Sequence, residues 1–183
     1  MGKIRIKTFS PGEKIPEGVI LPKQTHSTRI VEVFGSGDDL KKTDGIYTRN
    51  PHLLLGVKTA DCAPIALVED GQFGILHAGW RGLVNGIIEN MLTHFNQPEI
   101  YVGPFLFDFE IQMDDCYHAI KKRFGTTFFI ERDSKIFFDF LGAISEIIPS
   151  ATFDHRSTFH DKKLASWRRD RSNRSNCTII GGW

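Results

Sequence analysis

Three short apolar runs between residues 53 and 76, separated by turn residues, constrain the fold of this chain more than any other feature. Runs of this length predict strands rather than helices. They are Leu53–Val57, Ile65–Val68 and Phe73–Leu76. If the second and third runs pair across a turn at Asp70 and Gly71, then Cys62 and His77 lie at matching ends of two neighbouring strands. We therefore expect the thiol and the imidazole to approach one another.

A glycine-rich turn from Gly79 to Gly82 follows His77 and leads into apolar residues at helical spacing. This periodicity predicts a helix over about residues 82–95. A strand, a glycine-rich turn and a helix in succession direct free backbone N–H groups at whatever lies above the turn. Arg81, in the first turn of that helix, is therefore predicted to bind an anion.

His26 lies upstream, just before another apolar run at residues 29–34. Two imidazoles and one thiolate from separate strand ends form a three-ligand set for zinc, and three protein ligands leave a fourth position open, as in catalytic sites. The spacing between Cys62 and His77 is not that of a zinc finger. Each residue alone has a simpler explanation, because a histidine at a strand end is more often a hydrogen-bonded residue and a free cysteine a packing residue. The metal hypothesis depends on all three residues together.

The length and composition indicate an ordinary globular protein. With 183 residues, the chain is expected to form one domain spanning residues 1–183. A net charge of +1 gives no reason to expect binding to nucleic acid or to a membrane surface, and an oligomer is compatible with the sequence but not indicated by it. Met1–Ser10 lacks the apolar core of a signal peptide, no apolar run approaches the roughly 20 residues that span a membrane, and the three cysteines are widely spaced. These features predict a cytoplasmic protein.

Further short runs predict strands on either side of the first three, and the second half of the chain holds more helix. The other predicted strands cover residues 3–9, 19–21, 29–34, 43–48, 100–102 and 178–180. Apolar residues at helical spacing predict helices over Met113–Phe124, capped by Gly125, and over Ile136–Ile148. His155–Arg174 is predicted to be a polar loop that could include a short strand. Many short strands with irregularly placed helices fit a doubly wound sheet poorly, so we expect an α+β fold with mixed β-sheets flanked by helices.

Six short motifs, taken in order, resemble the laccase-domain, or YfiH-like, family. They are Gln-Thr-His-Ser (24–27), Thr-Ala-Asp-Cys-Ala-Pro (59–64), His-Ala-Gly-Trp-Arg-Gly (77–82), Val-Gly-Pro (102–104), Phe-Glu-Ile (109–111) and Ser-Trp-Arg-Arg-Asp (166–170). The resemblance implies central β-sheets flanked by helices and a metal held by His26, Cys62 and His77. The chain departs from the family pattern in lacking an Arg-x-Gly-Gly-Val-Ser motif before the first of these motifs and in the residues that flank the last one.

The resemblance and the chemistry of the residues together assign roles around the metal. Catalytic roles are expected for Cys62, Asp61 and Arg81, and substrate-binding roles for Gln24, Asp44, Lys58, Trp80, Arg168 and Arg169. Asp61 could act as a general base, with a turn cap or a backbone-pairing carboxylate as the alternative. Arg168 and Arg169 could bind an anion, or they could be solvated surface charges.

Relatives of this family carry different names, which correspond to different chemistry. The resemblance implies a zinc-dependent purine nucleoside phosphorylase with adenosine deaminase activity, in which Zn²⁺ lowers the pKa of bound water while Arg81 and Lys58 position phosphate. The substrates would be a purine nucleoside and phosphate. A multicopper polyphenol oxidase is a weaker hypothesis, because a trinuclear copper cluster needs many imidazoles and the seven histidines include no His-x-His pair. Copper (Cu²⁺) could still occupy the three-ligand site in vitro.

Two other classes of function remain open. A metal-free cysteine hydrolase or amidase that edits peptidoglycan precursors would use Cys62 as the nucleophile and His77 or His26 as the base. It needs the same three residues as the zinc enzyme, so the metal content of the purified protein separates the two. A non-catalytic interaction protein is favoured only by the missing upstream motif.

Overall fold

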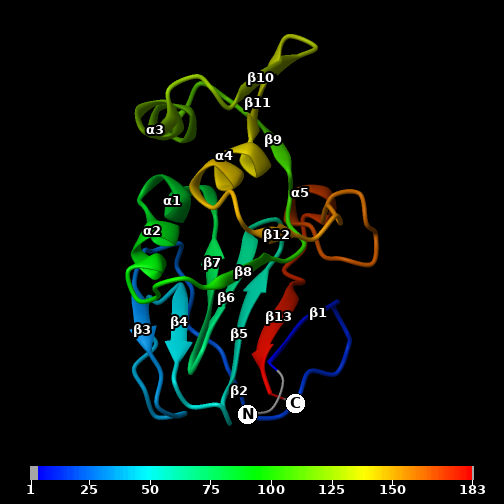
Figure 1. Ribbon diagram of the computed structural model, residues 1–183. Coiled ribbons are helices and arrows are strands. Elements are labelled where there is room, and N and C mark those ends of the chain that lie inside the picture. The colour runs from blue at the N-terminus through cyan, green and yellow to red at the C-terminus, as the bar shows by residue number, and fades with distance from the viewer. Residues whose placement is uncertain (1–3, 183) are drawn as a thin grey trace.

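Two mixed β-sheets and one antiparallel β-sheet form the framework of the molecule (Figure 1). The computed structural model describes residues 4–182. The six-stranded sheet has the order β12-β8-β6-β7-β4-β3, the four-stranded sheet β1-β13-β5-β2, and the three-stranded sheet β10-β11-β9. The strands are β1 (Arg5–Phe9), β2 (Val19–Ile20), β3 (Ile30–Glu32), β4 (Gly45–Thr48), β5 (Leu54–Thr59), β6 (Ala63–Glu69), β7 (Gln72–Ala78), β8 (Glu99–Val102), β9 (Asp108–Ile111), β10 (Phe129–Arg132), β11 (Lys135–Asp139), β12 (Thr152–Phe153) and β13 (Asn176–Gly181). The α+β class expected from the sequence is confirmed.

The β6–β7 hairpin forms as predicted across Asp70 and Gly71. Its register pairs Ala63 with Ala78 and Pro64 with His77. Gly71 has φ +82°, a left-handed conformation that glycine adopts without a steric penalty. Cys62 directly precedes β6, so the hairpin register places it beside the end of β7.

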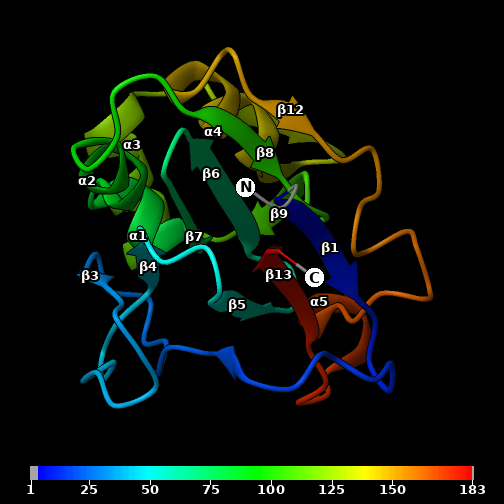
Figure 2. The ribbon, with the colours of Figure 1, turned by 60° about the horizontal axis from the view of Figure 1, so that its bottom comes forward.

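Two further pairings bring distant parts of the chain to this end of the hairpin. β4 pairs antiparallel with β7, and the backbone N–H of His77 donates to the carbonyl of Asp44 at 2.7 Å. β13 lies antiparallel between β1 and β5, with Asn176 opposite Thr59. Figure 2 shows β1 and β13 side by side, so the first and last strands complete the same sheet. The predicted first strand reaches from residue 3 to 9, and Lys3 lies outside the described residues.

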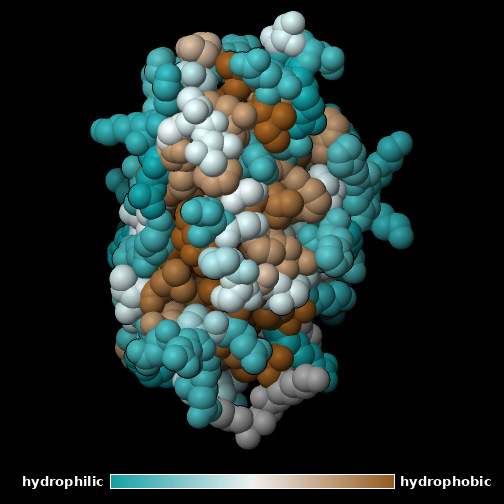
Figure 3. Space-filling model, turned by 45° about the horizontal axis from the view of Figure 1, so that its top comes forward, coloured by the Kyte–Doolittle hydropathy of each residue, from teal (hydrophilic) through white to brown (hydrophobic). Residues whose placement is uncertain are grey.

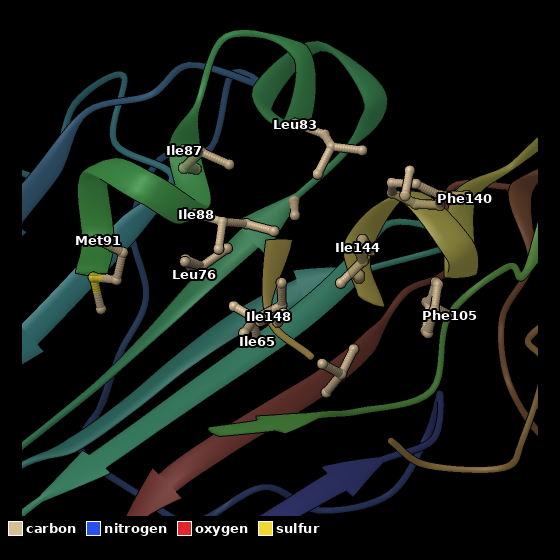
Figure 4. Packing of buried hydrophobic residues seen from close by; sticks show 14 of the residues in the cluster. Ile65, Leu76, Leu83, Ile87, Ile88, Met91, Phe105, Phe140, Ile144 and Ile148 are labelled. Carbon is tan, nitrogen blue, oxygen red and sulfur yellow. The ribbon is translucent and has the colours of Figure 1, made fainter. Parts of the chain in front are cut away.

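Short helices cover the six-stranded sheet and the top of the molecule. They are α1 (Trp80–Val84), α2 (Ile87–Leu92), α3 (Asp115–Phe124), α4 (Phe140–Ile147) and α5 (Trp167–Asp170). A single helix over residues 82–95 does not form, because Gly86 has φ +83° and separates α1 from α2. In Figure 4, Leu83, Ile88 and Met91 of these two helices pack over Leu76 of β7, within the largest apolar cluster. Within the described residues, no helix is long and apolar enough to cross a membrane.

The prediction of a helix over Ile136–Ile148 is wrong in its first part. Lys135–Asp139 form β11, and α4 begins only after it. Phe138 is fully buried and pairs with Phe109 of β9 on one side and Phe129 of β10 on the other. The spacing of the apolar residues in this run is compatible with either a helix or a strand. Pairing with two neighbouring strands decides in favour of the strand.

Other differences from the predicted elements are smaller. Helix α3 begins at Asp115 rather than Met113, because the side chain of Asp114 caps it by accepting from two backbone N–H groups, and Gly125 ends it as predicted. The predicted polar loop over residues 155–174 contains α5. Viewed with the top of Figure 1 turned forward, the surface shows a band of apolar residues between hydrophilic flanks (Figure 3).

Candidate metal centre

Three side chains from separate parts of the chain converge beside the end of the β6–β7 hairpin. Cys62 lies between β5 and β6, His77 in β7, and His26 in the loop after β2. One ligand atom from each residue lies within 4.8 Å of the other two. Cys62 Sγ is 3.8 Å from His26 Nε2, and the two imidazole centroids are 4.8 Å apart. Among residues 4–182, this is the one group of three or more His, Cys, Asp or Glu side chains placed to share a metal ion.

The buried carboxylate of Asp44 holds both histidines. Its Oδ1 accepts from the backbone N–H of His26 at 3.0 Å and from His77 Nδ1 at 2.9 Å. Its Oδ2 accepts from the backbone N–H groups of Thr25 and Ser27 at 3.0 and 2.7 Å, and from the Ser27 hydroxyl at 2.8 Å. These bonds hold His26 at φ +60°, which a non-glycine residue rarely adopts. Because Nδ1 of His77 donates to Asp44, Nε2 is the nitrogen available to a metal.

Neighbouring groups outweigh the effect of burial on the ionisation of this site. Burial would raise the pKa of Asp44, but the hydrogen bonds from His77 and residues 25–27 hold it well below its usual range. Burial would lower the pKa of His77, but Asp44 and Cys62 raise it to about 9. Burial would raise the pKa of Cys62, and hydrogen bonds from His26 and His77 bring it down to about 7. The site therefore favours the thiolate, which is the form that coordinates metals.

Gly79 allows the backbone to approach the three ligands closely. A Cβ atom at this position would lie 2.7 Å from Cδ2 of His26 and 3.0 Å from Sγ of Cys62. Both distances are shorter than van der Waals contact, so any side chain here would displace a ligand. The glycine-rich turn thus has a steric role at the site.

The donor set fits a single divalent metal ion. Nitrogen and sulfur ligands around a tetrahedral Zn²⁺ lie roughly 3.3–3.6 Å from one another. The 3.8 Å between Cys62 and His26 is close to this range, and the widest separation of up to 4.8 Å must shorten by about an ångström. His26 is exposed and lies on a loop, so it can make that adjustment. Two imidazoles and a thiolate suit zinc or copper better than magnesium or calcium.

Asp61 is held firmly next to Cys62. Its Oδ1 accepts from the hydroxyl of Thr158 and its Oδ2 from the backbone N–H of Arg168, both at 2.8 Å. Its own carbonyl accepts from the backbone N–H of Leu106 at 2.9 Å. These bonds stabilise the left-handed backbone of Asp61 at φ +91° and tie two distant loops to the site. Each carboxylate oxygen retains a further lone pair for a substrate proton.

A cavity of about 580 Å³ opens beside the three ligands. This volume lies within the range of small-molecule sites. The charged residues of its wall, apart from the histidines and the cysteine, are Lys58, Arg81, Arg168, Arg174 and Asp61. Four cations therefore face one carboxylate, and that carboxylate already accepts two hydrogen bonds. The cavity suits a ligand that carries negative charge.

Two tryptophans add flat apolar surface to the cavity. Trp80 lies at the start of α1, and the guanidinium carbon of Arg81 is 4.6 Å from its ring centroid. Trp167 lies at the start of α5 and keeps 51% of its surface exposed, with the guanidinium of Arg171 at 4.5 Å from its ring. An aromatic ring of a ligand could stack on either indole.

Most of the residues assigned to substrate binding from the sequence line this cavity. They are Gln24, Lys58, Trp80 and Arg168, together with the catalytic candidates Asp61, Cys62 and Arg81. The Gln24 side chain exchanges two hydrogen bonds with the backbone of Lys58, which fixes the loop that carries His26. Arg168 is more than a solvated charge, because its guanidinium lies 4.4 Å from the ring centroid of Phe109 and donates to the carbonyl of Glu110 at 3.1 Å.

Asp44 and Arg169 do not line the cavity. Asp44 lies behind the two histidines, as described above. The Arg169 guanidinium points into the preceding loop, where it donates to the Asp170 carboxylate and to four backbone carbonyls between residues 158 and 164. Its hydrogen bonds therefore support the loop rather than a ligand in the cavity.

Sequence reasoning assigned no site role to Phe109, Trp167 or Arg174, which also belong to the cavity wall. Phe109 and Trp167 lie within the Phe-Glu-Ile and Ser-Trp-Arg-Arg-Asp motifs, so membership of a motif could have indicated that they belong to the site. Arg174 lies outside every motif, and only the path of the chain after α5 brings it to the cavity.

Comparison with known proteins gives the chain a family. The family model described as multi-copper polyphenol oxidoreductase laccase matches residues 8–179. The chain belongs to this family. A purine nucleoside phosphorylase from Aquifex aeolicus is 29% identical over 97% of this chain and 87% of its own length. Proteins of the same name from Haemophilus influenzae and Staphylococcus epidermidis are 36% and 34% identical, over 50% and 63% of this chain and 38% and 50% of their own lengths. Curated relatives are thus named as enzymes.

Solved structures of other bacterial proteins have the same fold. A Neisseria meningitidis protein assigned to DUF152 superposes with a TM-score of 0.78 at 22% identity, covering 89% of this chain and 74% of its own. YlmD from Geobacillus stearothermophilus superposes with a TM-score of 0.76 at 22% identity, covering 91% and 74%. At this identity, the two structures establish the α+β fold of the family.

Proposed function

We propose that this protein is a zinc-dependent purine nucleoside phosphorylase that also deaminates adenosine. The observation that carries the proposal is the convergence of His26, Cys62 and His77 at one cavity whose other charged residues are mainly cationic. The names of its relatives support a purine nucleoside as the substrate. Zinc is proposed as the metal because three nitrogen and sulfur ligands with an open fourth position are typical of catalytic zinc. A thiolate ligand also fits the reducing cytoplasm, where we place the enzyme.

The residues around the three ligands suit phosphorolysis. When bound, the metal would supply Lewis acidity and would lower the pKa of a coordinated water molecule. Arg81 and Lys58 are proposed to bind phosphate and direct one of its oxygens at the ribose C1′. As that bond forms, the bond from C1′ to the purine nitrogen breaks, and the base leaves with the electron pair and takes up a proton. Trp80 and Trp167 provide surfaces on which the departing base can stack.

Deamination of adenosine would use the same cavity for a different bond. Water adds to C6 of the purine, and ammonia leaves. Asp61 is proposed to accept a proton from the water and return it to the leaving amine, because it lines the cavity and retains free lone pairs. Its two fixed hydrogen bonds keep the carboxylate in one orientation during that transfer.

A cysteine hydrolase or amidase is the second candidate, and one observation favours it. Cys62 Sγ lies 3.8 Å from His26 Nε2, and the pKa of Cys62 is lowered to about 7, so a nucleophilic thiolate is available without a metal. Such an enzyme would cleave an amide in a peptidoglycan precursor through an acyl-thioester with Cys62.

The test compares the two reactions in one preparation. Purified protein is analysed for bound metal and incubated with inosine or adenosine, with and without phosphate. We expect about one zinc per chain, phosphate-dependent release of free base and ribose 1-phosphate, and loss of activity on chelation and in Cys62→Ala. Chelator-resistant amide hydrolysis of a peptidoglycan precursor, without nucleoside turnover, would instead establish the cysteine hydrolase.

A further inference from the structure

A second cavity adjoins the cavity of the metal centre. Its volume is about 440 Å³, which also lies within the range of small-molecule sites. Leu106, Phe109 and Arg168 belong to the walls of both cavities. Arg171 belongs to the second cavity alone, so we call this space the Arg171 cavity. Trp167 of helix α5 lines the first cavity, Arg168 lines both, and Arg171, just after the helix, lines the second.

The two carboxylates of the Arg171 cavity are already neutralised. Asp108 Oδ2 lies 2.8 Å from Nη2 of Arg132, and Glu110 Oε2 lies 2.9 Å from Nζ of Lys135. The two remaining arginines of the wall form no ion pair with a carboxylate among residues 4–182. The wall of the cavity therefore holds three arginines against two carboxylates.

These two arginines, Arg168 and Arg171, are close enough to repel one another. Burial lowers the pKa of Arg168, and the neighbouring charge of Arg171 acts in the same direction, whereas Asp61, Cys116 and Glu110 act to raise it. Each guanidinium is held against a ring, with Arg168 at 4.4 Å from Phe109 and Arg171 at 4.5 Å from Trp167. An anion bound by both would relieve the repulsion and would find its donors already oriented.

The same cavity offers an aromatic surface with few neighbours. Phe159 lines it and remains 42% exposed, which is unusual for so large an apolar side chain. Its ring forms a T-shaped contact with His160 at a centroid distance of 5.6 Å. In the β10–β11 hairpin, the guanidinium of Arg132 lies over the ring of Phe137, 4.3 Å from its centroid, and presents a second flat surface. Flat surfaces next to unpaired cations suit a ligand that joins a planar ring to an anion.

We propose that the Arg171 cavity is a second ligand site, which binds an organic monophosphate with a planar ring, such as a nucleoside monophosphate. The phosphate group binds between Arg168 and Arg171, and the ring stacks on Phe159. The site is separate from the metal cavity and does not depend on the reaction proposed there. Because Arg168 belongs to both walls, a ligand in the Arg171 cavity contacts a residue that also faces the substrate.

Isothermal titration of the full-length protein with AMP tests the proposal. We expect saturable binding that weakens about tenfold or more in Arg171→Gln, because one charge-assisted contact is lost. The matched control is Arg174→Gln, another exposed arginine, which lines the metal cavity and not the Arg171 cavity, and it should keep the wild-type affinity. Cys62→Ala should also keep it. Phe159→Ala should weaken AMP binding but leave the binding of ribose 5-phosphate unchanged, since that probe has no aromatic ring.

Three results would overturn the proposal. One is the absence of AMP binding at millimolar concentration. Another is binding that survives Arg171→Gln but is lost in Arg174→Gln and Cys62→Ala, which would place the nucleotide in the metal cavity. The third is inorganic phosphate that binds as tightly as AMP and whose binding is lost in Arg171→Gln, which would remove the role of the ring. Phosphorolysis of inosine by the wild-type protein is measured separately, so failure of the proposed function is distinguishable from failure of this site.

Discussion

Replacing Asp44 by asparagine tests whether this carboxylate holds the metal ligands in place. The amide has the shape of the carboxylate but offers one acceptor oxygen and one NH₂ group. Oδ2 of Asp44 accepts three hydrogen bonds and Oδ1 accepts two. We expect the amide oxygen to take the Oδ2 position, so that its NH₂ group faces the backbone N–H of His26 and Nδ1 of His77. His77 can then only accept through Nδ1, which moves its proton to Nε2, the nitrogen that the metal requires.

The structure sets the size of the effect. Two charge-assisted hydrogen bonds are lost at a fully buried position, and each is worth roughly 1.5–3 kcal/mol. Asp44→Asn should therefore lower the free energy of unfolding of the metal-free protein by about 3–6 kcal/mol. Metal affinity should fall about 10- to 100-fold, as is usual when the partner of a ligating histidine is changed.

Urea unfolding measures the first quantity, and competition with a chromophoric zinc chelator measures the second. Asp39→Asn is the matched control, because Asp39 is exposed and its side chain accepts only from the backbone N–H of Lys41. It should change stability by less than about 0.5 kcal/mol and leave zinc affinity unaltered. Wild-type zinc affinity in Asp44→Asn would refute the view that this carboxylate positions the two histidines.

Three further predictions separate ligand, packing and loop-supporting roles. Gly79→Ala should abolish stoichiometric zinc binding, because its Cβ would lie 2.7 Å from the His26 ring. The control Gly35→Ala places a Cβ with nothing within 4 Å, so metal analysis of that variant should find normal zinc binding. Cys62→Ala should lose zinc with little change in Tm, while Cys116→Ala should lose about 1 kcal/mol of stability and keep zinc, because Cys116 packs against the apolar core. The reverse pattern would contradict these assignments. Arg169→Ala should lower the free energy of unfolding, measured in urea, by about 2–4 kcal/mol, because the Arg169 guanidinium donates to a carboxylate and to four carbonyls. A loss below about 0.5 kcal/mol would show that the loop keeps its structure without these hydrogen bonds.

The hairpin at the metal centre was predictable because its information is local. Two apolar runs with a two-residue turn specify both the pairing and the register, and the register then places Cys62 beside His77. The break between α1 and α2 was harder to predict from the sequence. Apolar residues keep helical spacing across Gly86, and the left-handed backbone of that residue becomes visible only in the fold.

The run at residues 135–148 shows a second limit of local pattern. Its phenylalanines satisfy the spacing of a helix, yet those before Phe140 lie in a strand because β9 and β10 present backbone groups that must be paired. β10 precedes β11 directly as the other arm of a tight hairpin, but β9 ends at Ile111, before helix α3, so no short window centred on β11 contains that second pairing. Strand identity here is a property of the assembled sheet.

Local motifs were sufficient to single out His26, Cys62 and His77 as a group that could hold a metal, because thiolate and imidazole are typical zinc ligands. Tertiary structure alone decided what surrounds them. Asp44 reaches partners 18 and 33 positions away through the pairing of β4 with β7. Arg168 and Arg169 are adjacent in sequence and chemically identical, yet the first lines both cavities and the second holds the loop before it. Successive residues of a helix point in different directions, and the partners that each direction meets are set by how the loops pack around it.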